Sequence, residues 1–184
     1  PSQLTVGRIH NCVLDETRVA CWARRNSNEN YGQSVVPSLY NPKQLSAGIW
    51  HTCAIDDTGV VCWGDNTHGQ ITVPALSNPT HVSNGERQSC AIDDTGVVCW
   101  GQSISGSANA PKLSNPIQVS IGKAHSCALD DTGVVCWGNN KYNQIEVPEL
   151  NNPTWLSSVK YATCALDESG IVCWGYPDEF KYIL

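Results

Sequence analysis

Ten cysteines are the side chains with the most reactive chemistry in this 184-residue chain, and they fall into five pairs. Within every pair eight residues separate the two cysteines, and a tryptophan follows the second. An even number of cysteines at fixed spacing predicts a disulfide framework and an oxidising compartment. Structural zinc sites usually place paired cysteines about two to four residues apart, so the spacing argues against a metal site. We expect disulfides at all ten positions, which are Cys12, Cys21, Cys53, Cys62, Cys90, Cys99, Cys127, Cys136, Cys164 and Cys173.

The spacing within a pair also predicts a β-hairpin. If Cys53 lies opposite Cys62, the turn falls at Asp57-Thr58 and Ile55 lies opposite Val60. Opposite cysteines are within disulfide distance, so each pair is expected to bond internally. The alternative pattern joins the second cysteine of one repeat to the first cysteine of the next. The expected pairs are Cys12–Cys21, Cys53–Cys62, Cys90–Cys99, Cys127–Cys136 and Cys164–Cys173.

Histidine recurs two residues before the first cysteine of a pair, at His10, His51 and His125. A ring of histidines could bind a metal ion. Two of the five repeats break the pattern, however, with Gln88 and Ala162 at the equivalent positions. We therefore favour a structural role, such as a hydrogen bond to a neighbouring backbone.

Adjacent aspartates recur between the cysteines and raise the question of carboxylate catalysis or calcium binding. They fall at the expected hairpin turn, where aspartate is common because it tolerates unusual backbone dihedrals. No Ser-His-Asp or Cys-His arrangement recurs, and the cysteines are assigned to disulfides. The sequence therefore predicts no enzyme, with no catalytic residues, no cofactor and no metal. The pairs are Asp56-Asp57, Asp93-Asp94 and Asp130-Asp131.

The cysteine pairs belong to a longer repeat. Successive first cysteines, at 12, 53, 90, 127 and 164, are 41, 37, 37 and 37 residues apart. Such a period indicates a solenoid, a propeller or an array. Short apolar segments separated by turn residues predict three or four short strands in each repeat and no helices. The expected fourth strand falls, for example, at Ile71–Val73 and at Ile145–Val147. One repeat domain, 1–184, is expected, with repeats at about 1–41, 42–78, 79–115, 116–152 and 153–184.

Both faces of the expected hairpin are apolar, so each repeat should be buried between two neighbours, like a propeller blade. The chain holds an integral number of repeats, cut within a connector, with a last strand at 182–184. This count predicts an all-β propeller of five three- to four-stranded blades, closed into a ring by contact between the Leu14 and Ile171 hairpins, with one disulfide per blade. The alternatives are a fragment of a longer seven-bladed chain and an open arc completed by another subunit.

The repeat pattern Gly-x-x-His-Ser-Cys-Ala-Leu-Asp, followed by Val-Val-Cys-Trp-Gly-x-Asn, resembles that of the regulator-of-chromosome-condensation superfamily. The resemblance covers the whole chain and rests on Gly122, His125–Ser126, Ala128–Leu129 and Trp137–Asn139. The short period and the Val-Pro step resemble most the secreted propeller-type β-lactamase inhibitors, whose blades are similarly small. The resemblance implies a β-propeller that binds through loops on one face and has no chemistry of its own. The cysteines are an addition to the family pattern.

Charge and hydropathy exclude several classes of protein. The net charge is −6, from 11 basic and 17 acidic residues, and no basic run occurs. The footprint of a nucleic-acid binder is therefore missing, and chromatin binding or nucleotide exchange is not expected. The apolar runs are too short to cross a membrane. No leader segment and no methionine occur, which is typical of a processed or excised chain. A secreted, extracellular protein is expected, with its oligomeric state left open.

A binding site should lie where the repeats differ, because a repeat protein keeps its scaffold positions and varies its contact positions. The variable positions are the two residues after the conserved glycine and the loop after Trp-Gly. They carry tryptophan, tyrosine and arginine, which dominate binding hot spots. The predicted binding residues are Trp50, Arg87, Tyr161, Tyr142, His68, Arg24, Arg25 and Tyr31.

These positions predict an extracellular protein partner, for which the chain would serve as an inhibitor, an adhesion module or an assembly module. The alternative is a lectin that binds glycans. A lectin should repeat its site in every blade, whereas the variable positions differ from blade to blade. The sequence therefore favours one composite protein epitope.

Overall fold

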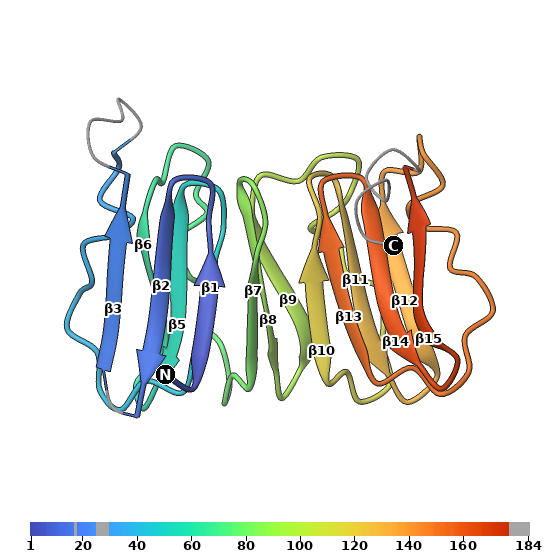
Figure 1. Cartoon of the computed structure of the whole chain (residues 1–184), viewed down its shortest axis with the longest axis horizontal. Coiled ribbons are helices and arrows are strands. Elements are labelled where there is room, and N and C mark those ends of the chain that lie inside the picture. The colour runs from blue at the N-terminus through green and yellow to red at the C-terminus, as the bar shows by residue number, and fades with distance from the viewer. Residues whose placement is uncertain (17, 25–29, 177–184) are drawn as a thin grey trace.

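The computed structural model describes residues 1–16, 18–24 and 30–176. Within these residues every regular element is a β-strand, and the strands form five three-stranded antiparallel sheets, one in each repeat. The sheets stand side by side in an arc (Figure 1). The predicted all-β propeller architecture is therefore confirmed, with each sheet forming one blade. No helix long and apolar enough to cross a membrane occurs among the described residues.

Every blade has the same strand order, first to second to third. The first strands are β1 (Gln3–Val6), β4 (Gln44–Ala47), β7 (His81–Asn84), β10 (Gln118–Ile121) and β13 (Trp155–Val159). The second strands are β2 (His10–Asp15), β5 (His51–Asp56), β8 (Gln88–Asp93), β11 (His125–Asp130) and β14 (Ala162–Asp167). The third strands are β3 (Arg18–Ala23), β6 (Gly59–Gly64), β9 (Gly96–Gly101), β12 (Gly133–Gly138) and β15 (Gly170–Gly175).

All ten cysteines form disulfides within their own hairpins, as predicted. In the second blade Cys53 lies opposite Cys62, with their Cα atoms 4.1 Å apart, and Ile55 lies opposite Val60. The other four blades share this register. The alternative of disulfides between successive repeats is wrong, because each second strand pairs with the third strand of its own blade.

The hairpin turn is held by its first carboxylate. Asp56 accepts hydrogen bonds from the backbone and hydroxyl of Thr58 at 2.7 and 2.6 Å, and from the backbone of Tyr40 at 2.9 Å. Burial acts to raise the pKa of Asp56, but these hydrogen bonds outweigh it and hold the pKa below its usual range. Asp93, Asp130 and Asp167 make the same contacts. The aspartates are therefore structural turn residues, as predicted.

A fourth strand is not formed in the described residues. Each blade therefore has three strands, the lower of the two predicted numbers. At Ile71–Val73 the backbone makes local turn bonds instead, from Thr72 to the carbonyl of Gly69 and from Val73 to that of Ile71. These bonds take the donors that a fourth strand would need for pairing. The equivalent segment 145–147 behaves in the same way. The strand expected at 182–184 lies outside the described residues.

The core lies between the blades. Leu45 of β4 is 2% exposed and packs with Cys12, Leu14, Ala54 and Trp63, so one disulfide sulfur of the first blade is part of the interface. The equivalent clusters recur along the arc. The repeat tryptophans of the second to fifth blades are buried, whereas Trp22 of the first blade is 50% exposed.

The predicted closed ring is not found in the described residues. The first and fifth blades stand at opposite ends of the arc (Figure 1), and the expected contact between their hairpins is not formed. Leu4 is 61% exposed, although its equivalent Leu45 is 2% exposed, and Leu166 and Ile171 on the fifth blade are 42% and 68% exposed. The rotation between neighbours is set by the packed interface, and five such rotations do not return to the first blade.

Candidate functional site

The turns between first and second strands, together with the loops after the third strands, lie at one end of the blades, at the top of Figure 1. We call this end the loop face and the opposite one, with the five hairpin turns, the hairpin end. The loop face comprises residues 7–9, 48–50, 85–87, 122–124 and 160–161, and the described parts of the loops at 24–34, 65–70, 102–107, 139–144 and 176.

The recurring histidines anchor the loop face from below. His10 Nε2 lies 2.8 Å from the hydroxyl of Thr52 in the next blade, and that hydroxyl donates to the carbonyl of Gln33, which also accepts from the Trp63 indole. Because the hydroxyl donates its proton to the carbonyl, the histidine must donate from Nε2. We therefore assign His10 as the neutral Nε2–H tautomer. In the third blade Gln88 takes the place of the histidine and donates to the hydroxyl of Ser126 in the fourth blade.

Burial keeps these histidines neutral. It lowers the pKa of both His51 and His125 to about 4. Their Nε2 atoms contact the hydroxyls of Ser89 and Thr163 at 2.9 and 2.8 Å. The described residues contain no group of three or more histidine, cysteine or carboxylate side chains placed to hold a metal ion. These hydrogen bonds give the histidines a structural role between blades, but the partner is a side-chain hydroxyl and not the predicted backbone group.

The conserved glycine before each histidine brings the turns of neighbouring blades together. A Cβ atom on Gly48 would lie 2.6 Å from Cε1 of His51 and 2.5 Å from the carbonyl oxygen of Gly85 in the next blade. Only glycine permits this approach. A backbone hydrogen bond from Ile49 to Gly85 joins the two turns at 3.2 Å. The two variable residues after each glycine are thereby held in a fixed position on the loop face.

A first aromatic cluster forms around Trp50, one of the predicted binding residues. Tyr31, also predicted, meets it edge to face with the ring centroids 5.9 Å apart. The guanidinium carbon of Arg8 lies 4.8 Å from the centroid of the Trp50 ring, within cation–π distance. Arg8 was not among the predicted site residues, although it occupies one of the variable positions.

A second aromatic cluster joins the fourth and fifth blades. Tyr142 lies 5.0 Å from Tyr161 and 4.8 Å from Tyr176, measured between ring centroids. The ammonium groups of Lys123 and Lys141 lie 6.0 and 5.3 Å from the centroids of Tyr161 and Tyr142. The prediction included Tyr142 and Tyr161 and missed Tyr176 and the two lysines.

The remaining predicted residues stand apart from both clusters. Arg87 lies 3.9 Å from the carboxylate of Glu86 and lines a small pocket of about 200 Å³. His68 lies in the loop after β6, where its backbone donates to the side chain of Gln70. Arg24 is exposed, with its backbone bonded to the first turn. Arg25 lies outside the described residues.

A pocket that sequence reasoning missed opens where the loop-face ends of all five first strands converge. It has a volume of about 810 Å³ and an apolar wall that includes Val6, Ala47, Ile121 and Val159. We call it the axial pocket. The first residue after the conserved glycine, or its equivalent in the fifth blade, lines it in every blade. These residues are Arg8, Ile49, Glu86, Lys123 and Lys160. The sequence could therefore have indicated this pocket. Its signal is the set of residues at the first variable position, compared between repeats apart from the second variable position.

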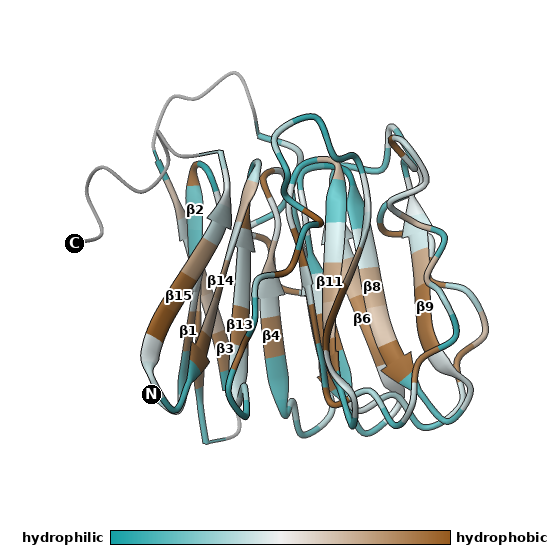
Figure 2. Cartoon of the chain, turned by 90° about the vertical axis from the view of Figure 1, so that its right-hand side faces the viewer, coloured by the Kyte–Doolittle hydropathy of each residue, from teal (hydrophilic) through white to brown (hydrophobic). Residues whose placement is uncertain are grey.

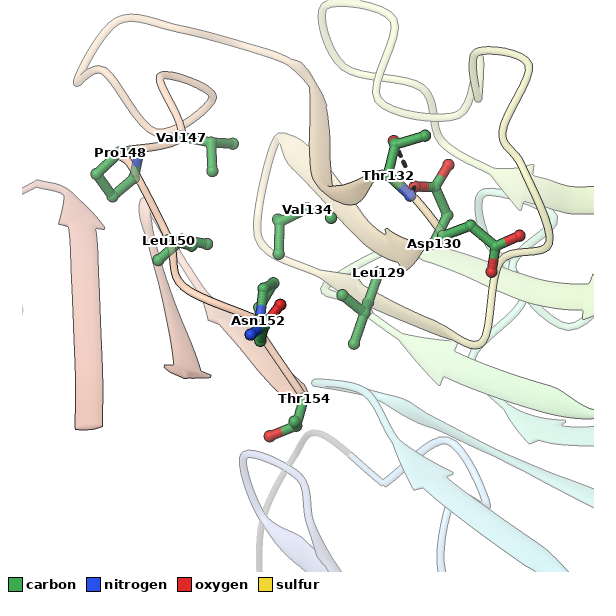
Figure 3. Close-up of a pocket in the computed structure, with 12 residues that line it drawn as sticks. Leu129, Asp130, Thr132, Val134, Val147, Pro148, Leu150, Asn152 and Thr154 are labelled. Atoms are coloured by element: carbon green, nitrogen blue, oxygen red, sulfur yellow. Dashed lines mark hydrogen bonds between the residues drawn. The ribbon is translucent and has the colours of Figure 1, made fainter. Parts of the chain in front are cut away.

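Two further pockets lie at the hairpin end, between a hairpin and the connector to the next blade, with volumes of about 620 and 690 Å³. Figure 3 shows the smaller one, where Leu129 and Val134 face Val147 and Leu150. Of its two carboxylates, Asp130 is engaged by Thr132 and by the backbone of Ser114, and Asp131 accepts a hydrogen bond from the side chain of Asn115. The polar groups of this pocket thus hold the turn, and the loop face remains the stronger candidate for a binding site.

Fold and site together define a class of protein, a β-propeller built from short repeats that presents a loop-built surface at one end. Residues 43–70 and 117–144 match the family model of the regulator of chromosome condensation (RCC1) repeat. Two of the five repeats therefore match the RCC1 repeat, which is the family that the sequence pattern resembled. No curated protein matches the chain at a significant level.

Several solved propellers share the fold. The entire ectodomain of the receptor kinase CR4 from Physcomitrella patens is 26% identical with a TM-score of 0.77, over 95% of this chain and 52% of that one. The CRINKLY WD40 ectodomain of ACR4 from Arabidopsis thaliana is 24% identical with a TM-score of 0.71, over 94% and 62%. Prp20p from Saccharomyces cerevisiae is 16% identical with a TM-score of 0.80, over 94% and 57%. The chain thus spans between half and two thirds of the length of these relatives.

Proposed function

We propose that this chain is a non-enzymatic binding propeller that recognises a protein partner through its loop face. The observation that carries the proposal is the gathering of aromatic and cationic side chains at positions that differ between blades. Trp50 with Tyr31 and Tyr142 with Tyr161 form two such groups on one end of the molecule. Loops held by a rigid scaffold are common sites of recognition, and Trp, Tyr and Arg dominate hot spots.

A protein partner is favoured over a glycan because the two aromatic clusters are not copies of one another. One combines Trp50, Tyr31 and Arg8, whereas the other stacks three tyrosines beside lysines. A site repeated from blade to blade would suit a repeated sugar unit, but a composite surface suits one protein epitope. The solved propellers give further support, since Prp20p was studied for its binding to Gsp1p and histones, and yeast RCC1 was solved bound to Kap60.

We place this binding outside the cell. Five disulfides occur among the described residues and no free cysteine remains among them, which is typical of oxidising compartments. The CR4 and ACR4 propellers, which share the fold, are receptor ectodomains. An inhibitor, an adhesion module and an assembly module all fit this description.

The experiment captures partners from the extracellular fraction of the source with immobilised protein and measures their affinity for variants. Trp50→Ala should weaken binding by about 2 kcal/mol, because a tryptophan held by its neighbours is a typical hot spot. Trp155→Ala is the matched control, since Trp155 is 50% exposed and lies on β13, away from the loop face. Unchanged affinity in alanine variants of Trp50, Arg87, Tyr142, Tyr161 and Tyr31 would refute the proposal, and binding to a glycan array instead would favour a lectin.

A further inference from the structure

Charge is distributed unevenly between the two ends of the molecule. Each of the five hairpin turns carries two adjacent carboxylates, and the described cations of these turns and of the connectors beside them are Arg18, Lys43, Lys112 and the amino terminus. The described residues of the loop face carry six cations against two carboxylates, Asp65 and Glu86. The six cations are Arg8, Arg24, Arg87, Lys123, Lys141 and Lys160. A chain with a net charge of −6 therefore presents a locally positive end.

Half of those six cations surround the axial pocket. Arg8, Lys123 and Lys160 line it together with one carboxylate, Glu86, so cations outnumber anions in its lining. Lys123 lies 3.4 Å from Glu86. The carboxylate of Glu86 and the neighbouring Tyr161 raise the pKa of Lys123, so this cation stays charged. The walls between the charges are apolar, which strengthens the field inside the pocket.

We propose that the axial pocket receives an acidic segment of the partner protein, whose carboxylates pair with Arg8, Lys123 and Lys160. The inference rests on the proposed function, since it names the chemistry that one part of the loop face recognises. The pocket volume of about 810 Å³ is sufficient for a few side chains. Aliphatic side chains of the segment would pack on Val6 and Ile121, and its carboxylates would displace Glu86 from Lys123.

The geometry favours an acidic polypeptide over a nucleic acid or a sulfated glycan. A polyanion of regular charge is bound along a stripe of cations, whereas these three cations surround an apolar pocket that contains a carboxylate. The ten carboxylates at the hairpin end would also repel a long polyanion that extended past the loop face. A short acidic segment escapes this repulsion because the pocket holds it at the far end of the molecule.

The test uses a fluorescently labelled peptide of alternating glutamate and leucine, with a glutamine–leucine peptide as its neutral counterpart, and measures binding by fluorescence anisotropy. We expect the acidic peptide to bind, the neutral peptide not to bind, and added salt to weaken the complex. Lys123→Glu/Lys160→Glu should weaken binding about tenfold. Glu86→Gln should strengthen it, a gain that misfolding cannot produce.

The matched control reverses two charges at the other end, Arg18→Glu/Lys43→Glu, and should leave the affinity of the peptide unchanged. An equal loss in this control would show that only net charge matters and would overturn the inference, as would no binding of the acidic peptide. Tighter binding of a heparin oligosaccharide or single-stranded DNA, with the same dependence on Lys123 and Lys160, would assign the pocket to a different class of partner. If the peptide fails while Trp50→Ala still weakens a captured protein, the proposed function stands and this inference falls.

Discussion

At the scale of single residues, the histidines of this chain hold one blade against the next. His51 donates from Nε2 to Ser89, whose hydroxyl donates to the carbonyl of Gln70, and the Trp100 indole donates to the same carbonyl. All of these groups are buried. A buried polar group that loses its partner carries its full desolvation cost, so the network specifies how the blades align.

Replacing this histidine should therefore reduce stability in a way that depends on the substitute. We expect His51→Ala to lower the free energy of unfolding by about 1–3 kcal/mol, because Ser89 loses its donor. His51→Gln should cost less, since Gln88 fills the same role in the third blade. Urea unfolding under oxidising conditions measures both, with the less buried His68→Ala as control. Equal losses in all three variants would contradict this account.

The same histidines predict a pH dependence of stability. Burial lowers the pKa of His51 and His125 to about 4 in the folded protein, below the ordinary histidine value of 6.5 that applies to the unfolded chain. Between these values the unfolded state binds more protons, so the stability present above pH 6.5 should be lost as the pH falls towards 4. Unfolding midpoints across this range test the trend. His51→Gln/His125→Gln should flatten it, and an unchanged slope in that variant would assign it to other groups.

At the scale of elements, the hairpin of each blade carries its disulfide into the interface with a neighbour. Cys90 and Cys99 pack in the same cluster as Val119 and Trp137 of the fourth blade. The bond therefore has two roles, as a cross-link within a hairpin and as apolar packing between blades. A hairpin that is already paired restricts its own unfolded chain, so the cross-link contributes less than loop length alone suggests.

Two variants separate these roles. Cys90→Val/Cys99→Val removes the cross-link but keeps apolar volume, and should lower the free energy of unfolding by at most about 3 kcal/mol. Cys90→Ala/Cys99→Ala also empties part of the interface and should cost about 1–2 kcal/mol more. Chemical denaturation compares the two. Similar losses in both would mean that the sulfurs contribute little to packing.

At the scale of the whole molecule, the described blades form an open series in which each contacts its immediate neighbours. The third blade is packed on both faces, whereas Leu4 of the first blade and Ile171 of the fifth lie on exposed faces. The fifth blade also lacks two groups that join the first, second and fourth blades to their next neighbours. Trp155 stands where Gln3, Gln44 and Gln118 bond to the next blade, and Ala162 stands where the histidines do.

Hydrogen exchange should reflect this order. In a series of repeats the stability of each unit depends on its neighbours, so the end units open first. We expect the slowest amide exchange in β8 and the fastest among the strands in β1 and β15. Mass spectrometry of exchanged peptides resolves these elements. Uniform protection across all five blades would instead indicate a closed, cooperative ring in solution.

The sequence by itself determined the features that depend on neighbours along the chain. The interval between Cys53 and Cys62 sets the hairpin register, and the aspartate beside the turn closes it through local hydrogen bonds. Repetition then identified the blade, and the variation at Trp50 and Tyr161 identified one end as a surface for binding. Such features follow from spacing because a strand alternates its side chains between two faces.

The tertiary structure alone decided the features that depend on distance between blades. Counting repeats predicted a closed ring, but the rotation at each packed interface determines whether the chain returns to its start, and no count of residues contains that angle. The convergence of Arg8, Lys123 and Lys160 on the axial pocket is of the same kind. Those residues are at least 37 positions apart in sequence and meet only because five first strands are gathered side by side.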